Sequence, residues 1–193
     1  MLDKLLQLKT NLTLLPKSPV GHLTELHLPF LREILDKVKP KKILEFGFNA
    51  GHSSTIFLTL TDAEVISADP GNAWVWVGSN EVKEMFGKRF KFFNTSSQDS
   101  ELYQHLLSIQ YQPDLVFVDG DHSYEGCYRD LELSFKFSSE YILVDNLEDT
   151  DNVGNAVNKF CEDYPYEKVL VEEITETKQR LALLKKKKEV NKA

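Results

Sequence analysis

The chain has 193 residues, of which 41% are hydrophobic and 27% charged, and its formal net charge is -7. This composition is ordinary for a globular protein long enough to bury a substantial core. The acidic balance argues against a nucleic-acid partner, which would require a basic face. Only two cysteines occur, Cys127 and Cys161, so we expect no disulfide framework and a reducing, cytoplasmic location. No apolar run approaches the length of a membrane span, so no membrane partner is expected.

Two helices are predicted ahead of the first strand. The first is marked by Leu2, Leu5, Leu6 and Leu8. The second has apolar residues at helical spacing between Leu23 and Val38 and ends at Lys39-Pro40. We expect both helices to pack on the core; the alternatives are that they cover the ligand crevice or form a homodimer contact.

Apolar stretches alternate with helical patterns along the rest of the chain. After a first strand that ends near Glu45, strands are expected over residues 64–69, 90–93, 114–119 and 141–144. Helices are expected over residues 54–60, 81–86 and 101–109, from residue 124, and over residues 153–164. Residues 168–174 and 180–184 predict an antiparallel hairpin. The pattern indicates an α/β fold, Rossmann-like and doubly wound, with a mostly parallel seven-stranded sheet and a C-terminal antiparallel hairpin.

These elements divide the chain into three parts. Residues 1–40 form the N-terminal helices, and residues 41–184 form the core domain on which the helices pack. Residues 185–193, which contain four consecutive lysines, are expected to be a solvated basic tail.

The segment ILEFGFNAGHSS predicts a buried strand, a tight turn and a helix start. Gly47 and Gly51 permit the turn, and Ser53 or Ser54 could cap the helix. The dinucleotide fingerprint is excluded because Glu45 stands where its first glycine would fall, and no Gly-Lys-Ser/Thr of a P-loop occurs. A carboxylate at this point favours a positively charged ligand. The pattern E-x-G-x-x-x-G-x-S resembles motif I of class I S-adenosylmethionine (SAM) dependent methyltransferases.

Polar residues gather at the predicted carboxyl ends of the strands, where such sheets bind ligands. They are Glu45, Asp69, Ser97, Gln98, Asp119, Asp121, His122, Asp145 and Asn146. Asp69 lies roughly 20 residues beyond the glycine turn, where an acid can accept both hydroxyls of a ribose; capping the turn that follows is the alternative. Ser97 and Gln98 could meet the edge of a base, whereas helix capping by Ser97, Asp99 or Ser100 is nearly as well supported.

Asp119, Asp145 and Asn146 are the sharpest chemical cluster. The two carboxylates would lie about 5 Å apart if their strands are neighbours. With the amide oxygen they form an all-oxygen set suited to Mg²⁺ or another divalent cation. The alternative is that one acid contacts the cofactor or caps a helix while the other is solvated.

Two motifs bring the resemblance closer. DGDHSY, which begins at Asp119, and VDN, which ends at Asn146, resemble motifs of cation-dependent O-methyltransferases of the catechol and caffeoyl-CoA type. The SQD loop at Ser97 is similar to theirs as well. DGDHSY is equally similar to a bacterial family of SAM-dependent methyltransferases with D-G-x-H-x-Y motifs. The resemblance covers roughly residues 43–146 and implies that the core domain binds SAM.

The resemblance also assigns roles to residues. The cofactor contacts that it implies are Glu45, Gly47, Phe48, Asn49, Gly51, Ser53, Asp69, Ser97, Gln98, Asp119, Gly120 and Asp121. Asp119, Asp145 and Asn146 would hold the metal. His122 stands where the catechol enzymes carry a catalytic lysine, so it could act as general base beside Asp119. A loop histidine bonded to backbone or substrate is the alternative.

These observations predict a SAM-dependent methyltransferase that acts on a hydroxyl of a small molecule with the help of a divalent metal. One alternative is a metal-independent small-molecule methyltransferase in which Asp119 and His122 form an acid–base pair. Another is a non-catalytic module that binds SAM or a nucleotide. The glycine spacing disfavours an NAD-dependent oxidoreductase, and the sequence does not name the acceptor.

Overall fold

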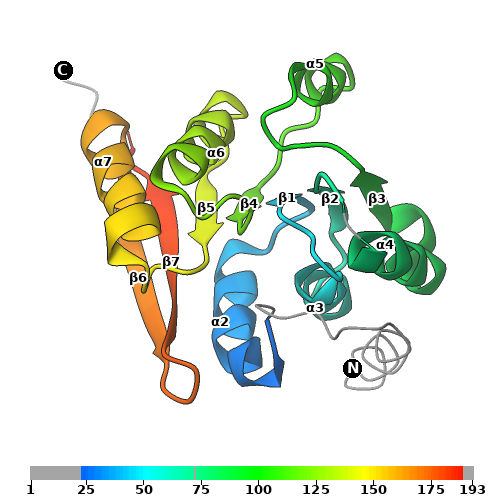
Figure 1. The fold of residues 1–193 in the computed structure, drawn as a ribbon, viewed down its shortest axis with the longest axis horizontal. Helices are drawn as coiled ribbons and strands as arrows, with labels where there is room; N and C mark the ends of the chain where they lie inside the picture. The colour runs from blue at the N-terminus through cyan, green and yellow to red at the C-terminus, as the bar shows by residue number, and fades with distance from the viewer. Residues whose placement is uncertain (1–22, 72, 189–193) are drawn as a thin grey trace.

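The computed structural model describes residues 23–71 and 73–188, and the helix expected over the first leucines lies outside them (Figure 1). The strands are β1 (Lys42–Phe46), β2 (Glu64–Ala68), β3 (Phe90–Phe93), β4 (Leu115–Val118), β5 (Tyr141–Val144), β6 (Tyr166–Ile174) and β7 (Gln179–Lys186). The α-helices are α2 (Leu28–Val38), α3 (His52–Leu60), α4 (Ala73–Phe86), α5 (Ser100–Ser108), α6 (Tyr124–Lys136) and α7 (Asn155–Asp163). Three short turns of helix are η1 (Glu25–His27), η2 (Gly87–Arg89) and η3 (Thr150–Gly154).

The seven strands form one sheet in the order β3-β2-β1-β4-β5-β7-β6. Strands β1 to β5 pair in parallel, and β7 runs antiparallel to both β5 and β6. The predicted fold is therefore confirmed, with one refinement. The second strand of the hairpin, β7, lies inside the sheet, and the first, β6, forms its edge.

Helices cover both faces of the sheet (Figure 1). Helices α2, α3 and α4 pack on one face, where the ring of Phe57 meets that of Phe117 with centroids 5.3 Å apart. Helices α5, α6 and α7 pack on the other face, where Leu131 and Phe160 are fully buried. Every residue of β4 is buried, as expected for a parallel strand covered on both sides. None of the described helices is both long and apolar enough to cross a bilayer.

Helix α2 and strand β7, near the two ends of the described chain, both pack into this core. Helix α2 buries Phe30 and Leu31 on the face shared with α3 and ends where predicted, at Lys39 in a left-handed conformation with φ of 50°. Strand β7 extends to Lys186, so two residues expected in the basic tail belong to the sheet. Lys185 lies 3.6 Å from the Glu140 carboxylate.

Helix α4 is longer than the sequence predicts, because it begins at Ala73 instead of near residue 81. Gly78 is a weak helix former, yet it lies within this helix. In the structure a Cβ at Gly78 would lie 2.3 Å from the carbonyl oxygen of Ala50. The glycine therefore lets α4 pack directly on the glycine turn that follows β1.

Candidate active site

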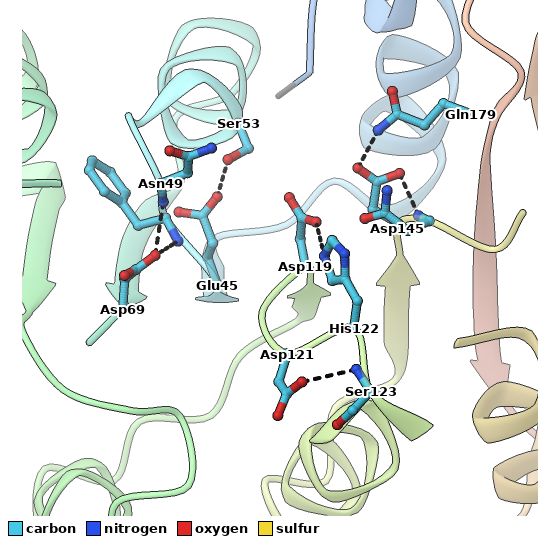
Figure 2. A network of polar contacts seen from close by, with 12 residues as sticks. Glu45, Asn49, Ser53, Asp69, Asp119, Asp121, His122, Ser123, Asp145 and Gln179 are labelled. Carbon is cyan, nitrogen blue, oxygen red and sulfur yellow. Dashed lines mark hydrogen bonds and ion pairs between the residues drawn. The ribbon is translucent and has the colours of Figure 1, made fainter. Parts of the chain in front are cut away.

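The ends of the parallel strands bring the predicted polar residues to one edge of the sheet (Figure 2). The Asp119 N–H donates to the Phe46 carbonyl at 2.9 Å, and the Asp145 N–H donates to the Val118 carbonyl at 3.1 Å. Four carboxylates follow one another along this edge, in the order Asp69, Glu45, Asp119 and Asp145. The expected shared location is confirmed.

The glycine turn closes against the neighbouring strand. Gly47 has φ of +89°, and a Cβ there would lie 1.9 Å from the carbonyl oxygen of Asp119. Only glycine allows the loops after β1 and β4 to approach this closely. Gly51, with φ of +85°, is the N-cap of α3.

Asp69 fixes the same turn from the side of β2. Its Oδ2 accepts the N–H groups of Phe48 and Asn49, both at 2.9 Å, and its Oδ1 accepts the Gly71 N–H at 2.9 Å (Figure 2). The turn-capping interpretation is thus correct for this chain. Oδ2 uses both of its lone pairs in these bonds and Oδ1 retains one, so a contact with a ribose hydroxyl stays a prediction.

Glu45 is enclosed beneath the turn with no solvent exposure. The hydroxyls of Ser53, Ser54 and Ser67 all donate to its carboxylate. The prediction that Ser53 or Ser54 caps α3 is wrong, because both lie inside the helix and their hydroxyls point to Glu45. Burial raises the pKa of Glu45 to about 7, although the three hydroxyls act in the opposite direction. The roles of Glu45 and Ser53 toward a cofactor stay predictions.

The loop after β3 is bonded to α6. The Ser97 hydroxyl donates to Asp130 Oδ1 at 2.7 Å, and the Arg129 guanidinium donates to Gln98 Oε1 at 3.3 Å. Asp99 caps α5 by accepting the N–H of Glu101 at 2.7 Å, as one of the sequence alternatives expected. Ser97 and Gln98 are therefore held from α6, and their contact with a base stays a prediction.

His122 pairs with Asp119. Its Nε2 lies 3.3 Å from Asp119 Oδ1, and 48% of its side chain is exposed, compared with 15% for Asp119 (Figure 2). The hydrogen bond to Asp119 raises the pKa of His122, whereas burial raises the pKa of Asp119. The pair has the geometry of a histidine oriented by a carboxylate at the solvent side of the sheet edge.

Asp121 belongs to the start of α6. Its Oδ1 accepts the Ser123 N–H at 2.9 Å, which lowers the pKa of Asp121. The Ser123 hydroxyl accepts the Gly126 N–H at 3.0 Å and caps the helix. Asp121 therefore has a local structural role, and its contact with a cofactor, like that of Gly120, stays a prediction.

Asp145 and Asn146 end β5 beside Asp119. Asp145 is buried, and its two oxygens accept the N–H of Asn146 and the amide of Gln179, both at 2.7 Å. Asn146 has φ of 58°, and its buried Oδ1 has no hydrogen-bond partner among the described residues. Over the same residues, no three His, Cys, Asp or Glu side chains lie close enough together to hold a metal. A metal here would need the Asn146 oxygen.

The family model of a methyltransferase domain matches residues 44–147. The chain belongs to this methyltransferase family. A relative, the uncharacterized protein R132 of Acanthamoeba polyphaga mimivirus, is 30% identical over 90 residues, which are 44% of this chain and 41% of that protein. The chain thus matches about two fifths of the length of that curated relative.

Solved methyltransferase structures share the fold. A putative O-methyltransferase from Klebsiella pneumoniae is 18% identical with a TM-score of 0.73, and the match covers 96% of this chain and 90% of that one. A Bacillus cereus O-methyltransferase in complex with SAH is 16% identical with a TM-score of 0.72 over the same shares. SAH-bound PaMTH1 of Podospora anserina is 19% identical with a TM-score of 0.74, and the match covers 96% and 88%.

Three polar residues around the site could not be recognised from the sequence. Gln179, at the start of β7, donates to Asp145, and His27 lies 2.9 Å from Gln179 Oε1. Asp130 is buried on α6 and binds Ser97. No local pattern could have identified them, because their partners are distant in the sequence.

Proposed function

We propose that the protein transfers the methyl group of SAM to a hydroxyl of a small-molecule acceptor. The observation that carries the proposal is the glycine turn, held by Asp69 on one side and close to Asp119 on the other. An acid fixed at the end of β2 suits a ribose. The family match and the SAH bound to the Bacillus cereus and Podospora anserina proteins support the same ligand class.

SAM would supply an electrophilic methyl group next to Asp119. The chain's own part is to bind and orient. Asp69 would accept a ribose hydroxyl at the free lone pair of its Oδ1. Ser97 and Gln98 would meet the base, and the Glu45 carboxylate beneath the turn would favour a cationic ligand. Holding the acceptor oxygen in line with the methyl group would provide most of the acceleration.

His122 would remove the proton from the acceptor hydroxyl. Because its Nε2 faces Asp119, its Nδ1 is the nitrogen left to take that proton. Asp119 would hold the ring and stabilise the charge that develops on it. The half-exposed position of His122 gives an acceptor access from solvent.

We also propose that a divalent cation assists the reaction. Asp119, Asp145 and Asn146 would hold it, and it would lower the pKa of the acceptor hydroxyl. Two observations support this set. The buried Asn146 oxygen has no partner among the described residues, and burial together with the charge of Asp119 raises the pKa of Asp145. A cation would satisfy the first and relieve the second.

The metal-independent alternative rests on the Asp119–His122 contact, which can move a proton without a cation. To test the function, SAM would be incubated with the protein and a panel of catechols, sugars and other hydroxyl compounds, with and without chelator. We expect SAH and a methylated product in equal amounts, and loss of both in excess chelator. Binding of SAM without product from any acceptor would support the non-catalytic module instead.

A further inference from the structure

The loop between β3 and α5 crosses the carboxyl edge of the sheet. Strand β3 is at one edge and is separated from β4 by β2 and β1. Yet the loop after β3 reaches α6, the helix that follows β4, through the Ser97 and Gln98 contacts with Asp130 and Arg129 (Figure 1). A nucleoside with its ribose at Asp69, directly after β2, would therefore have its base beside this loop.

Asp130 lies between two loops of the site. It has no solvent exposure, and its Oδ1 accepts the Ser97 hydroxyl at 2.7 Å. Its Oδ2 has no hydrogen-bond partner in the part of the chain that the structure describes. That oxygen faces Gly120, because a Cβ at Gly120 would lie 3.1 Å from it. One buried carboxyl group thus contacts both the loop after β3 and the loop after β4.

The hydrogen bond to Asp130 determines whether the Ser97 hydroxyl donates or accepts toward a ligand. A serine hydroxyl has one hydrogen to donate and two lone pairs to accept with. Since the hydrogen goes to Asp130, Ser97 can offer only lone pairs to a base. The 6-amino group of adenine is a donor and matches them. The 6-keto oxygen of hypoxanthine is an acceptor, so it would face Ser97 without a hydrogen between the two oxygens.

We propose that Asp130 is a specificity-determining positioning residue, which holds the Ser97 hydroxyl as an acceptor and so makes the site select a 6-aminopurine over a 6-oxopurine nucleoside. This rests on the proposed function, because it takes the base of SAM to lie against Ser97. Asp130 does not touch the ligand and acts through Ser97 alone.

The test is calorimetric binding of SAH and of S-inosylhomocysteine, which differs from SAH in the base. Wild type, Ser97→Ala, Asp130→Ala and the double variant would be compared at pH 8.5, where Asp130, with a pKa of about 7, is ionised and can only accept. Ser134→Ala is the matched control. Ser134 is also buried on α6, but its hydroxyl donates to the Asp130 carbonyl oxygen and not toward the loop.

We expect wild type and Ser134→Ala to prefer SAH by at least about 10-fold, which is the cost of one mismatched polar contact. In Ser97→Ala and in Asp130→Ala the preference for SAH should fall at least about 5-fold. In the double variant the preference should fall no further than in either single variant, because both changes act through the same hydroxyl.

Ser97→Ala keeps the test valid if Asp130→Ala does not fold, because an unchanged preference in Ser97→Ala alone would overturn the proposal. Equal weakening of both ligands in Asp130→Ala would show a structural role only and would also overturn it. Absence of SAH binding by wild type would instead refute the proposed function.

Discussion

Asp119 and Asp145 follow directly after Val118 and Val144, which pair between the parallel strands β4 and β5. The two carboxylates therefore end neighbouring strands, and the charge of Asp119 adds to burial in raising the pKa of Asp145. Two acids placed this way repel each other unless a proton or a cation lies between them. A change at this pair of acids can therefore distinguish the metal-dependent mechanism from the metal-independent one.

Replacement of Asp145 by alanine tests the metal mechanism. We expect the metal-dependent rate of methyl transfer to fall roughly 100-fold or more, because one oxygen ligand of the cation is lost. SAM affinity should change by less than about 3-fold, since the predicted cofactor contacts are elsewhere. Steady-state rates and SAM binding would be measured with and without chelator. Asp151→Ala, at an exposed acid in η3, is the control, and full activity of Asp145→Ala would favour the metal-independent alternative.

Replacement of His122 by alanine tests the general base. The rate should fall roughly 100-fold, and added imidazole should restore part of it, because the half-exposed side chain leaves room for a small base. His105→Ala, at an exposed histidine on α5, should retain the wild-type rate. An undiminished rate in His122→Ala would show that His122 is a loop histidine with no part in proton transfer.

Replacement of Gly47 by alanine tests the close approach of two loops. The added methyl group would collide with the Asp119 carbonyl, so we expect a loss of more than about 3 kcal/mol in the free energy of unfolding. Gly87 also has a positive φ, of +58°, but a Cβ there would meet nothing within 4 Å. Gly87→Ala should therefore cost about 1 kcal/mol or less. Urea unfolding followed by tryptophan fluorescence would compare the two, and equal losses would contradict the packing described at Gly47.

Replacement of Asp130 by asparagine tests the burial of its carboxyl group. Burial raises its pKa from 3.8 to about 7, so the folded protein holds this proton more tightly than the unfolded chain. The wild type should then lose stability relative to Asp130→Asn as pH rises from about 4 to about 7, by up to about 4 kcal/mol. Above pH 7 the difference should stay constant.

Asp121 provides a control for that experiment, because its effect on stability should change with pH in the opposite direction. Its hydrogen bond from Ser123 lowers its pKa, so its contribution to stability is present above the unfolded pKa and is lost as pH falls through the folded one. Asp121→Asn should thus lose stability relative to wild type as pH rises through the acidic range. A stability gap between wild type and Asp130→Asn that does not change with pH would contradict the raised pKa of Asp130.

Much of the fold could be predicted from periodicity. The runs that form β4 and β5 are continuous and apolar because both faces of these strands are buried. The alternation of strands and helices predicts that the polar residues share the carboxyl edge of the sheet. It also predicts that Asp119 and Asp145 are neighbours there. Strand ends in a parallel sheet lie together whatever the intervening helices contain.

The polar contacts within the site could not be predicted in this way. Ser97 and Asp130 are 33 positions apart, and Asp145 and Gln179 are 34 apart. Periodicity tells which face of an element is buried, but it does not tell which donor meets which acceptor. For the same reason Ser53, expected as a helix cap, proved to bind Glu45 instead.

If the glycine turn and Asp69 form a SAM site, calorimetric titration of the protein with SAH will detect it. We predict saturable binding to wild type and at least about 10-fold weaker binding to Asp69→Ala, because the variant loses both the ribose contact and the bonds that hold the turn. Absence of any binding heat with wild type at millimolar SAH would contradict a SAM site at this turn, and so would equal affinities of the two proteins.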